Sequence, residues 1–239
     1  MTAERVVILA HGQPSDPGPA AAELVALTRR IAAHLPEHDL RAATLAEPGA
    51  LAGAVAGGRG GLVFPLFMAG GWFTREAVPA RLAAVGADPG EGAGTGDWRV
   101  LPPFGTARAL HDLALAQIRE SGAEEVLLAA HGSFRSAAPA EVAQGVAARI
   151  AEETGLPARA AFIEQEPTLA QMRGFGPGAV CLPFFAMSGG HVTQDLPSAL
   201  AEAAFPGRVL PAIGLDRRVP ALIADLIRQG AIAGRARQV

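Results

Sequence analysis

The sequence predicts an α/β protein of two similar lobes, each a parallel four-stranded sheet flanked by helices, produced by internal duplication. Two observations predict this fold class. Short, wholly apolar segments bounded by Gly and Pro alternate with helical patterns, which is typical of parallel sheets covered by helices on both faces. The sequence also contains an internal repeat of one unit, and we place the two lobes at residues 1–121 and 122–239.

Each half is expected to run strand, helix, strand, short helix, strand, helix, strand, helix. The first strand is "VVILAHG" (6–12), which matches "VLLAAHG" (126–132). The next three corners pair "LAEPGAL" (45–51) with "EQEPTLA" (164–170), "LVFPLFMAGGW" (62–72) with "AVCLPFFAMSGGH" (179–191), and "RVLPPFG" (99–105) with "RVLPAIG" (208–214). The repeat therefore covers almost the whole chain.

Composition and charge exclude several functions. The net charge is −3 and the sequence has no basic run, so we expect no nucleic-acid partner and no membrane surface. The apolar run "VVILA" is too short for a signal peptide or a membrane span, so we expect a cytoplasmic protein. We separately expect a monomer. The single cysteine, Cys181, lies in an apolar stretch and reads as a buried hydrophobic residue; one cysteine holds neither an internal disulfide nor an iron–sulfur cluster.

Polar residues that could carry chemistry follow three strands of the second half. These are His131, Glu164 in "FIEQEP", and His191 after "AMSGG". Each residue stands at the end of a different strand of one sheet, so the three side chains are able to converge. Ligands of such sheets bind outside the carboxyl ends of the strands. Two histidines and a carboxylate commonly bind a divalent transition metal with coordination positions left open, and an acid–base site is the alternative.

The first half lacks two of these three groups. His11 matches His131, but the alignment places Leu45 opposite Glu164 and Trp72 opposite His191. Because a fold-related residue should recur in both halves, the unmatched groups indicate a functional site in the second lobe.

Two other carboxylates and a serine have simpler interpretations. Glu47 and Glu166 both precede the proline of a helix first turn, where the helix dipole favours a carboxylate. "AMSGGH" resembles a nucleophile elbow around Ser188, but a serine hydrolase of that type needs an acid and then a histidine downstream. No histidine follows His191, which argues against this alternative.

The segments "LLAAHGS", "FIEQEPTL" and "CLPFFAMSGGHVTQDLP" resemble the sirohydrochlorin chelatases, the small class II chelatases that insert cobalt or iron into a tetrapyrrole for cobalamin or siroheme. The resemblance implies a lyase with a two-lobed chelatase fold and an open cleft, and no cofactor beyond the Co²⁺ or Fe²⁺ that is its substrate. Position by position, His131, Glu164 and His191 match the family's metal-binding and catalytic residues. The first lobe would then form a wall of the cleft.

The implied substrate carries many carboxylates, which arginine side chains bind well. Arg135 and Arg173 lie near the expected strand ends, Arg75 offers a third guanidinium from the other lobe, and Ser133 belongs to the His-Gly-Ser motif. The aromatic face of Trp72 could stack on the macrocycle. The alternative function is a tetrapyrrole or metal carrier that binds without turnover.

Overall fold

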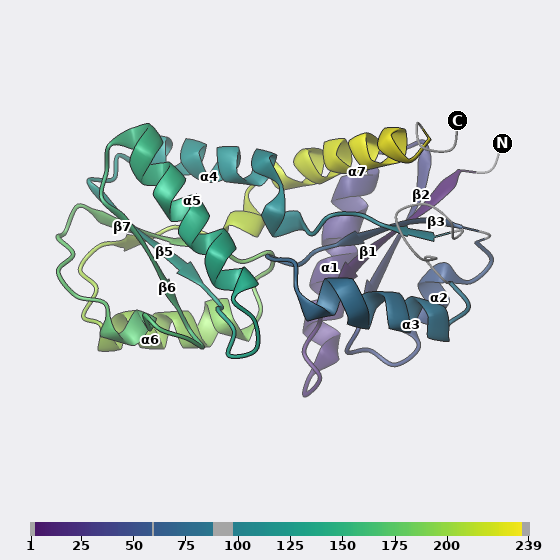
Figure 1. Cartoon of the computed structure of the whole chain (residues 1–239), viewed down its shortest axis with the longest axis horizontal. Helices are drawn as coiled ribbons and strands as arrows, with labels where there is room; N and C mark the ends of the chain where they lie inside the picture. The colour runs from purple at the N-terminus through teal and green to yellow at the C-terminus, as the bar shows by residue number, and fades with distance from the viewer. Residues whose placement is uncertain (1–2, 59, 88–97, 236–239) are drawn as a thin grey trace. The chain divides into compact units, whose positions relative to one another are not determined.

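The chain forms two four-stranded parallel sheets in the computed structural model, which describes residues 3–58, 60–87 and 98–235 (Figure 1). The strand order is β2-β1-β3-β4 in the first sheet and β6-β5-β7-β8 in the second. All the strand pairs in these two sheets are parallel. The predicted fold class is therefore confirmed. None of the helices in these described ranges is both long and apolar enough to cross a membrane.

The elements of the first half follow the predicted order. They are β1 (Glu4–Ala10), α1 (Pro17–Ala32), β2 (His38–Thr44), α2 (Ala50–Val55), β3 (Gly61–Pro65), a π-helical turn (Phe73–Ala77), α3 (Val78–Ala84), β4 (Trp98–Val100), a 3₁₀ turn (Phe104–Thr106) and α4 (Arg108–Ser121).

The second half repeats this order, with a 3₁₀ turn in the place of α2. Its elements are β5 (Glu125–Ala130), α5 (Ala138–Thr154), β6 (Ala158–Phe162), a 3₁₀ turn (Leu169–Gln171), β7 (Ala179–Pro183), a π-helical turn (His191–Asp195), α6 (Leu196–Glu202), β8 (Arg208–Val209), a 3₁₀ turn (Ile213–Leu215) and α7 (Val219–Arg235). The expected short helix after β6 is thus a single 3₁₀ turn.

Local sequence explains why β5 and α5 form where they do. Strand β5 is central in its sheet, and the side chains of residues 126–129 are fully buried, which requires the continuous apolar run "VLLA". Helix α5 has a proline in its first turn and ends at Gly155, whose φ of 72° is a left-handed conformation that glycine adopts easily. Its buried residues recur at helical spacing and form one apolar face: Ala140, Ala143, Val146, Ala147 and Ile150.

The chain divides into two compact units that differ from the predicted halves by one helix each. Unit 1 comprises residues up to Phe104 together with those from Arg217 onward, and unit 2 comprises Gly105–Asp216. Helix α4 packs against α5 and β7 of unit 2, whereas α7 packs against α1 of unit 1. The predicted boundary between residues 121 and 122 assigns each helix to the sheet that precedes it. Apolar periodicity locates an amphipathic helix but does not determine which sheet it covers.

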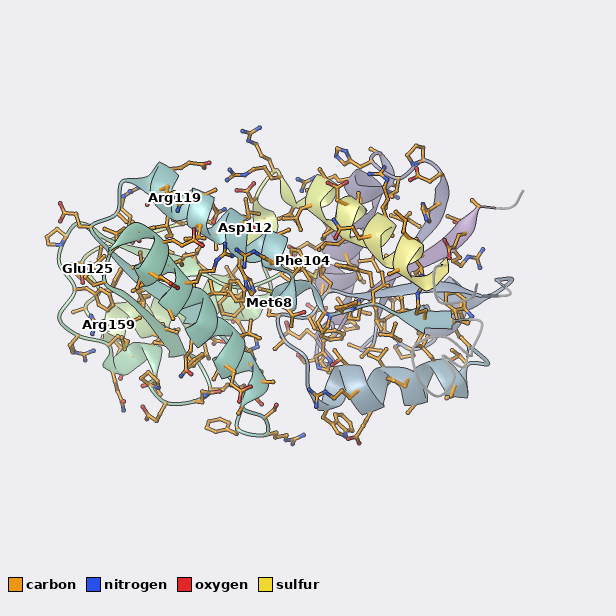
Figure 2. The ribbon with its side chains drawn as sticks, turned by 45° about the horizontal axis from the view of Figure 1, so that its top comes forward. Met68, Phe104, Asp112, Arg119, Glu125 and Arg159 are labelled. Carbon is orange, nitrogen blue, oxygen red and sulfur yellow. The ribbon has the colours of Figure 1, made fainter. Side chains whose placement is uncertain are left out.

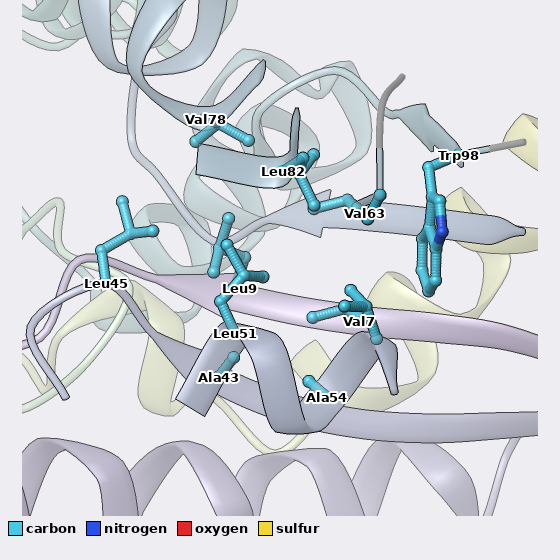
Figure 3. Close-up of a cluster of buried hydrophobic side chains, with 12 residues drawn as sticks. Val7, Leu9, Ala43, Leu45, Leu51, Ala54, Val63, Val78, Leu82 and Trp98 are labelled. Carbon is cyan, nitrogen blue, oxygen red and sulfur yellow. The ribbon is translucent and has the colours of Figure 1, made fainter. Parts of the chain in front are cut away.

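Each unit has an apolar core between its sheet and a pair of short elements. In unit 1 the cluster joins side chains of β1 and β3 to those of α2 and α3, and it includes Leu45 and Trp98 (Figure 3). In unit 2 the corresponding cluster joins β5 and β7 to the 3₁₀ turn after β6 and to α6. Cys181 is fully buried in this second cluster, as predicted.

Backbone hydrogen bonds correct the alignment of the two halves after β2 and β6. The N–H of Ala46 donates to His11 O at 2.9 Å, and the N–H of Glu164 donates to His131 O at 2.9 Å. The structural counterpart of Glu164 is therefore Ala46, and its pairing with Leu45 is wrong by one residue. The Glu-Pro dipeptides on which that pairing was based occupy positions one residue apart in the two turns.

The same correction applies after β3 and β7. The π-helical turns over Phe73–Ala77 and His191–Asp195 have equal length, and matching backbone hydrogen bonds reach Gly71 O and Gly189 O just before them. The counterpart of His191 is thus Phe73 rather than Trp72, because only one glycine of each pair is equivalent. At these two equivalent positions unit 1 still has neither a carboxylate nor a second histidine.

Candidate active site

Three neighbouring strands of unit 2 deliver the predicted site residues to one edge of the sheet. His131 directly follows β5, Glu164 comes two residues after β6, and His191 opens the π-helical turn after β7. Strand β5 lies between β6 and β7, so its histidine lies between the other two positions. The parallel topology therefore places all three residues at the carboxyl edge of this sheet.

The two histidine rings meet edge to face. The Nε2 atoms of His131 and His191 are 3.0 Å apart, with ring centroids 4.3 Å apart and ring planes at 89°. The side chains are 39% and 46% exposed, respectively. The paired nitrogens therefore lie where a ligand can approach from solvent.

The other nitrogen of each ring faces a hydrogen-bond acceptor. His131 Nδ1 is 2.9 Å from Gly132 O, and His191 Nδ1 is 2.7 Å from Asp195 Oδ2. A carbonyl and a carboxylate only accept hydrogen bonds, so the neutral tautomer that satisfies both acceptors carries its proton on Nδ1. In that tautomer neither Nε2 carries a proton, so each can donate its lone pair to a cation.

The spacing of the two Nε2 atoms fits one metal ion. With metal–nitrogen bonds of about 2.0–2.1 Å, two nitrogens 3.0 Å apart subtend about 90–100° at the ion. That angle suits octahedral or distorted tetrahedral coordination. Two protein ligands leave the remaining positions of such an ion open to water or to incoming nitrogens.

Glu164 lies beside this pair and not between the two Nε2 atoms. Its Oε2 is 3.7 Å from His131 Nδ1, so the carboxylate faces the opposite edge of that ring, and its side chain is 43% exposed. Among the described residues, no group of three or more His, Cys, Asp or Glu side chains is arranged to hold a metal ion. The structure thus brings two of the predicted ligands together and places the third alongside.

The loop that carries His131 packs closely against the loop that carries Glu164 and is hydrogen-bonded to it. Gly132 has a φ of +75°, and a Cβ at this position would lie 2.7 Å from Gln165 Cγ and 2.9 Å from Phe162 Cβ. Gln165 Oε1 accepts a hydrogen bond of 2.7 Å from the N–H of Ser133. Gln165 was not predicted as a site residue, although its position next to Glu164 was a usable signal.

Asp195 is a second residue that the sequence interpretation missed. Its hydrogen bond to His191 spans four residues, the spacing at which side chains of a helical segment lie on the same face. Asp195 belongs to the segment "GHVTQDLP" that carries the family resemblance, and this was the usable signal.

Ser133 and Arg135 lie on the His131 loop. Ser133 Oγ accepts a hydrogen bond of 3.1 Å from the N–H of Arg135, which fixes the loop between the two residues. Phe134, between them, is 83% exposed. The loop that follows His131 therefore carries an exposed aromatic ring and an exposed arginine.

Arg173 is not brought to this site. Its guanidinium donates to Ala170 O at 2.7 Å, Met172 O at 3.0 Å and Glu202 O at 3.3 Å. Arg159, labelled in Figure 2, is the second residue of β6. Its side chain donates to Arg173 O at 3.2 Å, which places Arg173 near the amino edge of the sheet. Its hydrogen bonds tie a connecting loop to the end of α6.

The predicted site residues of unit 1 occupy corresponding corners of the first sheet. His11 is exposed directly after β1. Trp72 is 57% exposed immediately before the π-helical turn, and Arg75 is exposed within that turn. Of the positions equivalent to His131, Glu164 and His191, only His11 carries a group that binds metals.

Comparisons with known proteins agree with this description. The CbiX family model matches residues 125–230, the region that contains the histidine pair. Two solved structures share the fold at low identity. SirB from Bacillus subtilis, solved with Fe³⁺, is 14% identical over 98% of both chains with a TM-score of 0.70. DR2241 from Deinococcus radiodurans, a multi-domain protein with structural similarity to chelatases, is 21% identical over 96% of this chain and 55% of its own, with a TM-score of 0.65.

A third solved structure is much more similar in sequence. It is CbiX, described as the terminal enzyme for biosynthesis of siroheme in denitrifying bacteria, with 42% identity and a TM-score of 0.84. The alignment covers 95% of this chain and 99% of that protein. The search of curated proteins gave no match. Identity at this level over nearly the full length of both chains shows that the protein belongs to the CbiX family of sirohydrochlorin chelatases.

Proposed function

We propose that this protein is an enzyme that inserts Co²⁺ or Fe²⁺ into sirohydrochlorin or a closely related tetrapyrrole, in siroheme or cobalamin synthesis. The observation that carries this proposal is the pair of Nε2 atoms of His131 and His191, 3.0 Å apart, with both Nδ1 atoms directed at acceptors. The identity of 42% with CbiX supports the same reaction class.

Metal insertion requires three events that this site suits. Water must leave the M²⁺ ion, the ion must be placed against the face of the macrocycle, and two pyrrole N–H protons must be removed. Two neutral imidazoles replace part of the water shell and leave positions open for pyrrole nitrogens. The exchange is one M²⁺ for two H⁺, so it needs neither a nucleophile nor a redox cofactor.

We assign proton transfer and charge stabilisation to Glu164. Its carboxylate lies 3.7 Å from His131 Nδ1 and is 43% exposed, so it can reach solvent as well as the ring. A carboxylate beside the imidazole stabilises the positive charge of a metal ion bound to that ring. General acid–base groups of this kind contribute typically about 10²–10⁴-fold to a rate.

The exposed loop after His131 is the proposed contact for the substrate. Arg135 offers a guanidinium for the carboxylates of the macrocycle, and Phe134 offers an apolar ring. Arg135→Ala should raise the KM for the tetrapyrrole and leave kcat nearly unchanged. Arg119→Ala is the matched control, because Arg119 is a half-exposed arginine of unit 2 that pairs with Glu153. Equal KM values for the two variants would remove Arg135 from the proposal.

The reaction itself is tested by the anaerobic visible spectrum of sirohydrochlorin with Co²⁺ or Fe²⁺ and a catalytic amount of protein. The proposal predicts conversion of many equivalents of tetrapyrrole, faster than without protein. A spectral change limited to one equivalent per protein would instead identify a carrier that binds without turnover. Running both metals in parallel measures which one the protein inserts faster.

A further inference from the structure

We infer that Asp195 is a positioning residue that holds His191 in the tautomer and orientation that the metal requires. This inference rests on the proposed function for its catalytic consequence, but its structural content can be tested without any insertion assay. Asp195 Oδ2 lies 2.7 Å from His191 Nδ1. A hydrogen bond from Nδ1–H to the carboxylate leaves the lone pair on Nε2, the atom that faces His131.

Helix capping does not explain Asp195. The residue precedes the first residue of α6, where an aspartate often accepts hydrogen bonds from the first turn. In the part of the chain that the structure describes, its side chain makes no capping hydrogen bond to α6, and its φ and ψ are helical at −69° and −43°. The carboxylate forms a hydrogen bond with His191 Nδ1 instead.

The first unit provides an internal control for a role in folding. Its π-helical turn over Phe73–Ala77 has the same length and also leads directly into a helix, α3. Ala77 takes the place of Asp195 there, so the turn forms without a carboxylate at that position. Phe73 takes the place of His191. The two positions equivalent to His191 and Asp195 thus hold neither a histidine nor a carboxylate in unit 1.

The solvent exposure of His191 and Asp195 also distinguishes a positioning role of Asp195 from a role in stabilising the fold. The side chains of His191 and Asp195 are 46% and 49% exposed, and exposed ion pairs stabilise a fold only slightly because solvent screens them. Removing the carboxylate should therefore leave the fold intact and change what His191 does. Loss of a carboxylate behind a ligating histidine typically costs roughly 10- to 100-fold in metal affinity or activity.

The tautomer is read from long-range ¹H–¹⁵N NMR spectra of the metal-free, ¹⁵N-labelled protein. The inference predicts that His191 of the wild type is protonated at Nδ1, and that Asp195→Ala shifts it toward protonation at Nε2. A wild-type ring protonated at Nε2 would overturn the inference. This readout is independent of whether the protein inserts metal.

The functional consequence is measured as the Kd for Co²⁺ and as kcat/KM for insertion. Asp195→Ala should weaken both by roughly 10- to 100-fold with nearly unchanged Tm. Asp195→Asn, whose amide oxygen can still accept from Nδ1–H, should retain more of both. Asp225→Ala is the control for loss of one negative charge, since Asp225 is an exposed carboxylate of α7 that pairs with Arg228.

Each other outcome contradicts positioning in a distinct way. Wild-type Co²⁺ affinity in Asp195→Ala would show that the hydrogen bond is unnecessary. Equal losses in Asp195→Asn and Asp195→Ala would assign the effect to charge. A large fall in Tm for both variants would assign Asp195 to folding. If the wild type binds Co²⁺ but does not turn over, the proposed function fails while the tautomer and affinity results still decide the inference.

Discussion

His131 and His11 follow the equivalent strands of two similar units, so exchanging each for alanine isolates the metal site from the fold. In unit 2 the corner contains His191 Nε2 at 3.0 Å from the His131 ring. In unit 1 the equivalent positions of the second histidine and the carboxylate hold Phe73 and Ala46. We predict that His131→Ala abolishes insertion and that His11→Ala keeps most of it.

The magnitudes follow from the contacts of the His131 ring. One hydrogen bond to Gly132 O and a 39% exposed side chain indicate a stability loss of about 1 kcal/mol, or about 2–4 °C in Tm. The loss in Co²⁺ affinity should exceed the roughly 10- to 100-fold typical of outer-sphere changes, because a direct ligand is removed. The insertion rate should fall by about 10²–10⁴-fold or more.

Both variants are compared by thermal unfolding, calorimetric titration with Co²⁺ and the anaerobic spectral assay. Because the predicted change in stability is small, a folded and inactive His131→Ala protein is the expected result. The reasoning is refuted if His11→Ala is the inactive variant, or if the two variants lose activity equally while remaining folded.

Three further predictions concern neighbouring groups. Glu164→Gln should slow insertion much more than Glu166→Gln, since Glu166 accepts a hydrogen bond from the N–H of Thr168 within its own turn; equal kcat values would refute this. Gly132→Ala and Gly12→Ala should both destabilise by about 1–3 kcal/mol, because each glycine has a φ near +75° and a Cβ would lie within 3.0 Å of the facing loop. Only Gly132→Ala should also lose insertion activity, and a matching loss in Gly12→Ala would contradict that. Burial raises the pKa of Cys181 to about 12, so iodoacetamide at pH 8 should alkylate it only after unfolding. Because the folded pKa lies above that of the unfolded thiol, the stability from the buried neutral thiol is full below about pH 8.5 and is lost as the pH rises toward 12. Rapid alkylation of the folded protein would refute this assignment.

The fold was predictable because its signals are local and repeated. Apolar runs such as residues 126–129 are long enough only for buried strands, and helical patterns between them require parallel sheets. The convergence of His131 and His191 followed from the same topology, since the carboxyl ends of adjacent parallel strands share one edge. Burial of Cys181 followed from its apolar neighbours.

The remaining features depend on geometry that residue patterns do not carry. The register shift that pairs Glu164 with Ala46 is set by backbone hydrogen bonds in two turns of different sequence. The direction of the Glu164 carboxylate depends on side-chain rotamers, and the role of Asp195 depends on a helical turn that begins at His191. The assignment of α4 to the second sheet is a tertiary choice that an amphipathic pattern leaves open.

The most direct test of the account is the position of the metal in crystals soaked with Co²⁺, located from its anomalous scattering. The account predicts one site in unit 2, about 2.0–2.1 Å from Nε2 of both His131 and His191. A Co²⁺ ion bound at His11, or bound in unit 2 without contact to both Nε2 atoms, would contradict it.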